Sequence, residues 1–420
     1  MMKTIQRAVL AIILAATTTM SLKAQNQKHY EEIIGKLASP AFQGRGYAYD
    51  GVRKAAKYVA KEYLKAGVDN VISQPFTINV NTFPGDMQMS VDGKQLKAGS
   101  DFTLREFSCG VKGKYKLYYI DTLNYSFDRV KADLAKTENK NAMVVSYFAF
   151  RQNHRNDFNK LEKELGKGVI YIWDTPLKYY KAYSASVSAK PIIWVASSFP
   201  KDAKDVEFSI DNKFFENYET ENVIAQIKGR SNDSCYVFVA HYDHLGNLGR
   251  DIYFPGANDN ASGTSMIITL AEYYAKHRPD YDIYFISCSG EECGLRGSDY
   301  FCNNPLFDLS RIKYLINFDM VGDNNKSMNC EVSKTGMRGL NLLETINKRG
   351  QFFESFIKGE LSANSDHYPF AQKGVPCILM INENGSTFPY YHTPEDNLQN
   401  ADYSIYSRLF RLTTDFIEEY

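Results

Sequence analysis

The second half of the chain alternates apolar strands with helices, and this alternation limits the fold more than any other feature of the sequence. Strands are predicted at "CYVFVAHYDH", "DIYFISCSGEE", "IKYLINFDMVG" and "VPCILMIN", and helices at "SGTSMIITLAEYYAKH" and "GLNLLETINKRG". Strands that are apolar on both faces need helices on both faces, as in parallel sheets. We therefore predict an α/β fold with a mostly parallel central sheet and helices on both faces.

The first half of the chain has a different pattern of predicted elements, a helical segment followed by short strands. Residues Tyr30 to Gly67 are predicted to be helical, because apolar residues recur at steps of three and four and Gly67 is a suitable stop. Short β-rich runs such as "GKYKLYYI" and "NAMVVSYFAF" then follow, separated by polar stretches. We predict that residues 85–217 form a β-rich insertion domain, and that residues 25–84 and 218–420 are the two parts of one α/β domain.

The amino terminus has the layout of a secretory signal peptide. Lys3 and Arg7 precede an apolar run from Ala8 to Ala16, and Ala24 closes a small-residue exit. We expect residues 1–24 to be removed and the protein to be exported, to the periplasm or the medium. A membrane anchor is disfavoured because the apolar run is well short of ~20 residues. No later run could span a bilayer, so no transmembrane segment is expected after cleavage.

Charge and cysteine content exclude several functions. The 49 basic and 49 acidic residues cancel, and no basic block stands out, so a nucleic-acid partner is not expected. The seven cysteines include no C-x-x-C pair, so a structural zinc-thiolate site is not indicated.

Candidate metal ligands follow the predicted strands of the second half. Nearly all of them lie at or just past the carboxyl end of a strand: His241, Asp243, Asp259, Glu291, Glu292, Asp319 and His392. In open α/β sheets, sites are built at this edge. We expect these side chains to converge there.

The residue types favour a two-metal zinc centre. Imidazole nitrogen and carboxylate oxygen are zinc ligands. Five ligands of these types are one or two more than a single catalytic zinc needs. A carboxylate that bridges two ions would explain the surplus, and Asp259, in the glycine-flanked helix entry, is the best candidate. Adjacent residues after a strand point in different directions, so Glu292 is predicted to bind metal while Glu291 acts as general base.

Five motifs together carry a family resemblance. "AHYDHLG", "GANDNASGT", "SGEECGLRGS", "NFDMVG" and "YHTPEDN", in this order, resemble the co-catalytic zinc aminopeptidase and glutamate carboxypeptidase family. The resemblance covers Asn222 to the carboxyl terminus and the helix after "FQGRG". Residues 85–217 look, more loosely, like the protease-associated insertion that some members carry.

The resemblance implies a role for each candidate residue. Two zinc ions would share Asp259, with His241 and Asp319 on one ion and Glu292 and His392 on the other. Asp243 would orient His241, and Tyr391 would donate a hydrogen bond to the oxyanion. The resemblance also implies a cis peptide bond between Asp259 and Asn260. The implied reaction is hydrolysis of peptide substrates from the amino end, with Glu291 moving the proton; ligands of this type also accept cobalt or manganese.

Other functions stay open at this point. A single-zinc glutaminyl cyclase uses the same fold, and a carboxypeptidase or dipeptidase would need a basic clamp for the substrate carboxylate. Candidates for that clamp are Arg296, Arg338 and Arg349. A non-enzymatic binding ectodomain is disfavoured because the ligands and the base are all present.

Three further features have ordinary structural interpretations. His244 is expected to support its turn or lie near the site without binding metal, and Asp366 and His367 are not expected to act in catalysis. Thr393 to Asp396 are typical of a helix start, with threonine as cap and proline in the first position.

Overall fold

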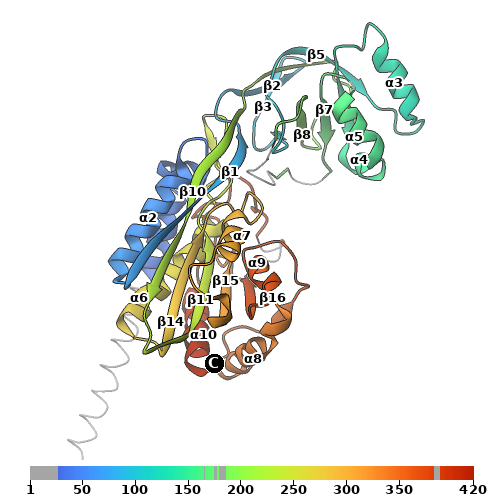
Figure 1. The fold of residues 1–420 in the computed structure, drawn as a ribbon. Coiled ribbons are helices and arrows are strands. Elements are labelled where there is room, and N and C mark those ends of the chain that lie inside the picture. Colours follow the sequence, from blue (N-terminus) through green and yellow to red (C-terminus); the bar gives the residue numbers. More distant parts are fainter. Residues whose placement is uncertain (1–26, 165, 175–176, 179–185, 383–387) are drawn as a thin grey trace, which may run out of the picture.

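The computed structural model describes residues 27–164, 166–174, 177–178, 186–382 and 388–420 (Figure 1). The predicted signal peptide, residues 1–24, lies outside the described residues. Within the described part of the chain, no helix combines the length and the apolar character needed to cross a membrane.

A central sheet of eight strands forms the body of the described structure (Figure 1). The strands lie in the order β1 (Asn70–Thr82), β10 (Lys213–Ile227), β14 (Tyr281–Cys288), β11 (Ser231–His241), β15 (Ile312–Phe318), β18 (Cys377–Ile381), β16 (Met328–Val332) and β17 (Phe356–Lys358). The four strands β14, β11, β15 and β18 pair in parallel, whereas β1 and β10 are antiparallel additions on one side. The predicted α/β class with a mostly parallel sheet is confirmed.

Helices cover both faces of this sheet, as the doubly apolar strands require. Successive residues of β11 point to opposite faces: Phe238 packs in one hydrophobic core and Val239 in another, and both are buried. One face carries α2 (Gly51–Ala66), α6 (Gly263–Lys276) and α10 (Tyr406–Glu419), with α8 (Met337–Gly350) beside α10. The other face carries α7 (Arg296–Asn303) and α9 (His367–Gln372).

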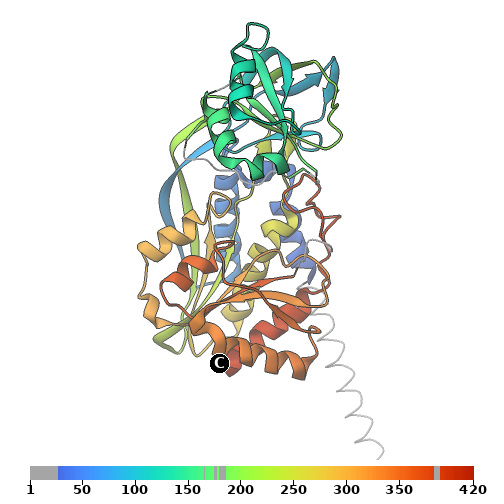
Figure 2. The same ribbon diagram turned by 90° about the vertical axis from the view of Figure 1, so that its right-hand side faces the viewer.

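A second sheet lies at one end of the molecule (Figures 1 and 2). Its strands are β3 (Lys94–Leu96), β2 (Met87–Val91), β9 (Asp205–Ile210), β5 (Val111–Tyr119), β6 (Ala142–Tyr147), β7 (Val169–Ile172), β8 (Ile192–Val195) and β4 (Phe102–Leu104). All of them fall within the predicted insertion, residues 85–217. The domain boundaries and the protease-associated type of the insertion remain predictions.

The insertion also contains helices that the β-rich pattern did not predict. These are α3 (Phe127–Ala135), α4 (Phe148–Asn153) and α5 (Arg155–Glu164). Strands β5, β6, β7 and β8 pair in parallel, and parallel neighbours need a crossover connection between them. Helix α3 connects β5 to β6, and α4 with α5 connects β6 to β7.

Strands β1 and β10 join the two sheets. They pair with each other along most of their length, from Asn70 opposite Gln226 to Thr82 opposite Lys213. The register shifts between Ile78 and Val80, which marks a bulge in this two-stranded ribbon. A small hairpin of β12 (Asn247–Leu248) and β13 (Ile252–Tyr253) lies outside both sheets.

The predicted helix from Tyr30 to Gly67 is interrupted. Residues 27–37 are helical, a 3₁₀ segment follows at Pro40–Arg45, and α2 begins only at Gly51. The predicted stop is confirmed, because Gly67 has φ of 82° and its N–H donates to the carbonyl of Leu64. Periodicity missed the interruption because the apolar residues on both sides of it face the same core.

Candidate metal centre

The predicted ligands converge at the carboxyl edge of the parallel strands. His241 is the last residue of β11, Glu291 and Glu292 follow the end of β14, and Asp319 follows β15. Asp259 lies in the irregular turn that enters α6, and its peptide bond to Asn260 is cis, as expected from the resemblance. The metal-ligand roles of these residues remain predictions, but their convergence is a feature of the fold.

The two carboxylate oxygens of Asp259 face two different groups of side chains. Asp259 Oδ1 lies 3.3 Å from His241 Nε2, which is also 3.4 Å from Asp319 Oδ1. Asp259 Oδ2 lies 3.1 Å from His392 Nε2, which is 3.4 Å from Glu292 Oε2. One carboxylate thus contributes to two neighbouring ligand sets.

These separations suit zinc. Ligand atoms that bind one tetrahedral zinc at about 2.0–2.2 Å lie roughly 3.3–3.6 Å from one another. Two clusters of ligand-capable atoms occur among the described residues, one of His241, Asp259 and Asp319 and the other of His244, Asp259 and Glu292. Within the described part, Asp319 Oδ1 is buried without a hydrogen-bond partner, which is costly unless a cation satisfies it. The donor set of these clusters therefore fits zinc.

Glu291 lies beside this centre without belonging to either cluster. Its Oε2 is 3.9 Å from His241 Nε2, and its side chain is 12 % exposed. Burial raises the pKa of Glu291 well above its usual range, and the nearby carboxylate of Glu292 raises it further. A carboxylate whose pKa is raised is a stronger base than a free one, which suits a general base.

Glu292 has the opposite character although it is the next residue. Burial alone would raise its pKa, but His392 and a hydrogen bond from His244 lower the pKa of Glu292 to about 2. Its carboxylate is held by imidazoles and stays ionised, as a metal ligand must. The two adjacent acids thus have pKa values shifted in opposite directions, upward for Glu291 and downward for Glu292.

Asp243 supports the site differently from the prediction. His241 Nδ1 lies 3.1 Å from the backbone carbonyl of Asp243, whereas the Asp243 carboxylate is 3.7 Å away. That carboxylate instead accepts from the hydroxyl of Tyr47 at 3.0 Å and from the backbone N–H of Glu291 at 3.2 Å. Asp243 therefore orients His241 through its main chain and fixes the backbone of Glu291 through its side chain.

His244 is closer to the centre than a turn-supporting residue would need to be. It is fully buried, and its Nδ1 lies 2.7 Å from Glu292 Oε1. Because His392 faces the other oxygen of the same carboxylate, His244 fixes the orientation of Glu292. The expectation that it lies near the site agrees with this geometry, although it is also among the ligand-capable groups.

Tyr391 and the residues that follow His392 form a turn. The Tyr391 ring stacks on the His392 imidazole with centroids 3.7 Å apart. The interpretation of Thr393 to Asp396 as a helix start is wrong, because no helix begins there. The buried carboxylate of Asp396 instead accepts from the backbone N–H groups of Asn258 and Asp259, at 2.8 and 3.0 Å.

Arg45 is the other support that sequence reasoning missed. It is 0 % exposed, and its guanidinium donates to backbone carbonyls of several segments. The acceptors are Leu37, Tyr242, Pro255, Gly256 and Asp259. Three of these acceptors belong to the turn that presents Asp259. Arg45 therefore binds the carbonyl groups of this turn, while Asp396 binds its N–H groups. The motif "FQGRG" contains Arg45, but nothing in its spacing indicates where the side chain goes.

Asp366 and His367 lie behind the centre. Ser365 donates to Asp319 Oδ2 at 2.6 Å, which leaves Asp319 Oδ1 facing His241. Asp366 accepts from Ser298 at 2.5 Å, and His367 Nε2 lies 3.5 Å from a carboxylate oxygen of Glu331. Neither residue belongs to a ligand cluster, and their expected lack of a catalytic role stays a prediction.

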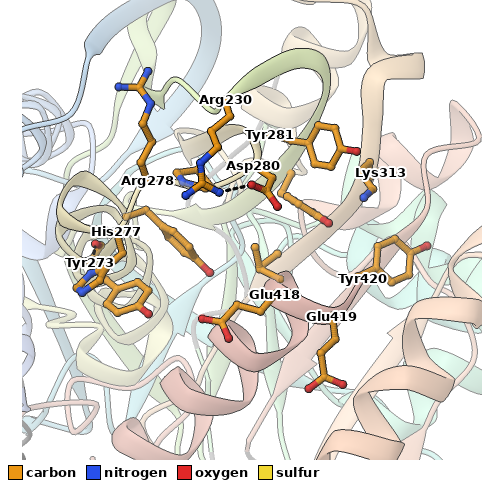
Figure 3. A pocket seen from close by; sticks show the side chains of 14 residues that line it. Arg230, Tyr273, His277, Arg278, Asp280, Tyr281, Lys313, Glu418, Glu419 and Tyr420 are labelled. Carbon is orange, nitrogen blue, oxygen red and sulfur yellow. Dashed lines mark hydrogen bonds and ion pairs between the residues drawn. The ribbon is translucent and has the colours of Figure 1, made fainter.

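A separate cavity of about 520 Å³ lies near the opposite ends of the strands (Figure 3). Tyr281 begins β14 there and Lys313 is the second residue of β15. Arg230 pairs with Asp280 there, and the Lys313 ammonium lies 4.3 Å from the centre of the Tyr281 ring. The ligand clusters found in the described part lie at the other edge, which is therefore the candidate site.

Comparison with known proteins agrees with this geometry. Residues 222–417 match the model of peptidase family M28. Aminopeptidase YwaD of Bacillus subtilis (strain 168) is 31 % identical over 205 residues, which is 46 % of this chain and 43 % of that protein. A probable leucine aminopeptidase 2 of Arthroderma benhamiae is 37 % identical over 178 residues, which is 39 % of this chain and 34 % of that protein. These matches span less than half of each relative's length.

Solved structures resemble the fold over nearly the whole chain. The zinc aminopeptidase BSAP of Bacillus subtilis has a TM-score of 0.71 at 23 % identity, covering 94 % of this chain and 95 % of that one. An aminopeptidase of Aneurinibacillus sp. strain AM-1 has a TM-score of 0.66 at 20 % identity, covering 94 % and 93 %. At this identity the likeness concerns the fold, and its coverage extends over both sheets.

Proposed function

Because residues 222–417 match the model of peptidase family M28, we propose that the protein is an exported aminopeptidase that uses two zinc ions to remove amino-terminal residues from peptides. The names of its relatives support the reaction, because both the Bacillus and the Arthroderma proteins are called aminopeptidases. The observation that carries the proposal is the position of Asp259, whose two oxygens face separate ligand sets.

The ligands divide between two ions. His241 and Asp319 would hold one with Asp259 Oδ1, and Glu292 and His392 would hold the other with Asp259 Oδ2. When bound, zinc supplies Lewis-acid polarisation of a carbonyl group and lowers the pKa of water. The buried carboxylates would also attract the free α-amino group of a peptide, which limits cleavage to the first residue.

The chain's own side chains move the proton and stabilise charge. Glu291 takes a proton from the attacking water and gives it to the departing amine, a task that its raised pKa suits. The Tyr391 hydroxyl donates to the oxyanion as the carbonyl becomes tetrahedral, and a donor of this kind contributes about 10²–10³ in kcat. Asp243 holds the backbone N–H of Glu291, so the base keeps its position during both transfers.

A peptide that begins Gln-Leu tests the reaction. Purified mature protein loaded with zinc is incubated with this peptide, and the products are identified by mass spectrometry. The expected result is stepwise loss of residues from the amino end, which N-acetylation of the peptide abolishes. Glu291→Gln should lower the rate at least about 10³-fold while two zinc ions remain bound, since it removes the proton acceptor but no ligand.

Each other product assigns another function. Loss of ammonia alone identifies a glutaminyl cyclase, and removal of residues from the carboxyl end identifies a carboxypeptidase. A zinc content of one ion per chain, with full activity, contradicts the role proposed for Asp259. An unchanged set of peptides across all sequences tried contradicts the enzymatic proposal itself.

Export has its own test. The proposed signal peptide predicts a mature chain that begins at Gln25 and is recovered outside the cytoplasm. Cell fractionation followed by sequencing of the amino terminus checks both points. A chain that retains Met1 in the cytoplasmic fraction contradicts export and leaves the proposed reaction untouched.

A further inference from the structure

A cavity of about 890 Å³ lies next to the candidate metal centre and is lined by both parts of the molecule. One wall comes from the insertion and includes Gly99 and Leu177. The other wall comes from two loops of the central domain, at Pro255 and at Tyr390. Both loops continue directly into the metal centre, because Pro255 precedes the turn of Asp259 and Tyr390 precedes Tyr391 and His392.

The insertion also contributes Lys178, the residue after Leu177, to this region. The Lys178 ammonium lies 5.0 Å from the centre of the Tyr391 ring, and the same ring stacks on His392. Lys178 is partly buried, and the described residues include no carboxylate within ion-pair distance of its ammonium. Contact with an aromatic face is a weak interaction at such a site, so it leaves the ammonium able to bind an anion.

Three other cations that could receive a substrate carboxylate are engaged elsewhere. Arg349 pairs with Glu419, and the Arg338 guanidinium lies 5.3 Å from the centre of the Tyr420 ring, both near the carboxyl-terminal helix α10. Arg45 directs its guanidinium at backbone carbonyls. Two of the three arginines named in the sequence analysis are thus remote from the cavity, whereas Lys178 lies against the predicted oxyanion donor.

The acids that line the cavity form no ion pair with Lys178 among the described residues. Asp174, Asp251 and Glu395 line it, and all three are exposed. Solvent screens exposed charges, so these carboxylates act weakly on a ligand near Tyr391.

Accordingly, and on the basis of the aminopeptidase function proposed above, we infer that Lys178 binds the carboxyl terminus of short peptides, so that dipeptides and tripeptides are the preferred substrates. An extended chain advances about 3.3–3.6 Å per residue. The terminal carboxylate of a dipeptide or tripeptide therefore lies about one or two residues beyond the scissile carbonyl, which faces the Tyr391 hydroxyl. A lysine beside the same ring reaches that position, because its side chain has four flexible bonds.

Paired substrates with and without the terminal charge test this inference. The value of kcat/KM is measured for Leu-Gly, Leu-Gly amide and Leu-Gly-Gly-Gly-Gly with the zinc-loaded enzyme. We expect Leu-Gly to exceed its amide at least about tenfold, the contribution of one charge-assisted hydrogen bond. Lys178→Met should bring that ratio close to one by slowing the free acid, and Lys178→Arg should retain most of it.

A matched control separates the charge from general damage to the insertion. Lys201 also lies near an aromatic ring, 5.8 Å from the centre of Tyr147, but this ring belongs to the insertion and is not the ring of Tyr391. Lys201→Met should leave the ratio of Leu-Gly to its amide unchanged. Circular dichroism melting of both methionine variants shows that each is folded at the assay temperature.

Three outcomes overturn the inference. An unchanged ratio in Lys178→Met shows that the lysine does not bind the carboxylate. An equal loss for acid and amide shows that Lys178 only positions Tyr391. Equal hydrolysis of acid, amide and pentapeptide by the unmodified enzyme also contradicts the inference while leaving the aminopeptidase intact, whereas hydrolysis of none of them contradicts the proposed function.

Discussion

Replacement of Arg45 by methionine should destabilise the protein and weaken the metal centre at once. Methionine keeps an apolar chain in the same space but removes every donor of the buried guanidinium. The carbonyls of Tyr242, Gly256 and Asp259, among others, then lose a charged hydrogen-bond donor in the interior. Burial lowers the pKa of Arg45 to about 10, so the side chain is charged under all ordinary conditions and the loss applies at any assay pH.

The magnitude follows from the number of carbonyls involved. Each hydrogen bond to a charged group contributes about 1.5–3 kcal/mol, but relaxation and water entry recover part of the loss. We expect Arg45→Met to lower the free energy of unfolding by at least about 4 kcal/mol. Arg45→Lys keeps the charge, but its three donors cannot serve five acceptors, so we expect a loss of about 2–4 kcal/mol.

The assay is urea unfolding of the zinc-free protein, followed by titration of the folded variants with zinc. The zinc affinity should fall in the same order as stability, because the lost contacts hold the turn that presents Asp259. Arg53→Met is the matched control: this arginine is 44 % exposed and pairs with Asp50 at 3.3 Å. Exposed pairs contribute about 0–1 kcal/mol, so this variant should behave almost like the unmodified protein.

Two results would refute the reasoning. A loss below about 1 kcal/mol in Arg45→Met would mean that water satisfies the carbonyls equally well. Lower stability with unchanged zinc affinity would mean that Arg45 stabilises the fold without fixing the Asp259 turn.

Three further predictions concern the same turn and its metal. Asp396→Asn should lower zinc affinity about 10–100-fold, as the loss of a support for a metal ligand usually does. The single oxygen of the amide cannot accept from the backbone N–H groups of both Asn258 and Asp259 as the carboxylate does. Isothermal titration with zinc checks this prediction. Gly256→Ala should cost at least about 2 kcal/mol more in urea unfolding than Gly67→Ala, since both have positive φ but only the first methyl would meet Asp259 and Arg45. Removal of zinc with a chelator should lower the melting temperature by several degrees, and added zinc should restore it. The reason is that a ligand that binds only the folded state stabilises it by about 4 kcal/mol at 1,000 times Kd. An unchanged melting temperature would contradict a metal-filled centre.

The carboxyl-edge position of the candidate ligands could be predicted from the sequence because it depends on topology alone. Parallel strands end at a common edge, so residues that follow β11, β14 and β15 must meet there. His241 and Asp319 needed no further information than the strand assignments. The two adjacent glutamates could be given different roles because neighbouring backbone positions point in different directions.

The supports of the site could not be predicted in the same way. Asp396 follows Thr393 and Pro394 in a pattern that local propensity assigns to a helix start, yet its carboxylate binds N–H groups more than 130 positions earlier in the chain. Arg45 contacts five carbonyls from three separate segments. Such contacts depend on how distant loops meet, and residue spacing carries no information about that.

Lys178 illustrates the same limit at a larger scale. The insertion contains no recognisable motif. Its β-rich sequence also did not predict α3, α4 and α5, because these helices are too short for a clear helical periodicity. Its lysine reaches Tyr391 because the two sheets are arranged end to end (Figure 2). A residue in such a segment becomes a functional candidate only when the arrangement of the two sheets is known.

The ribbon of β1 and β10 gives the cavity a mechanical property. Two hydrogen-bonded strands run from one sheet to the other, so any tilt of the insertion has to bend them together. Bending disturbs the fewest hydrogen bonds at the bulge between Ile78 and Val80, where the ladder is already interrupted. If the separation of Lys178 and Tyr391 changes when a peptide enters or a product leaves, we therefore expect the ribbon to bend at this bulge.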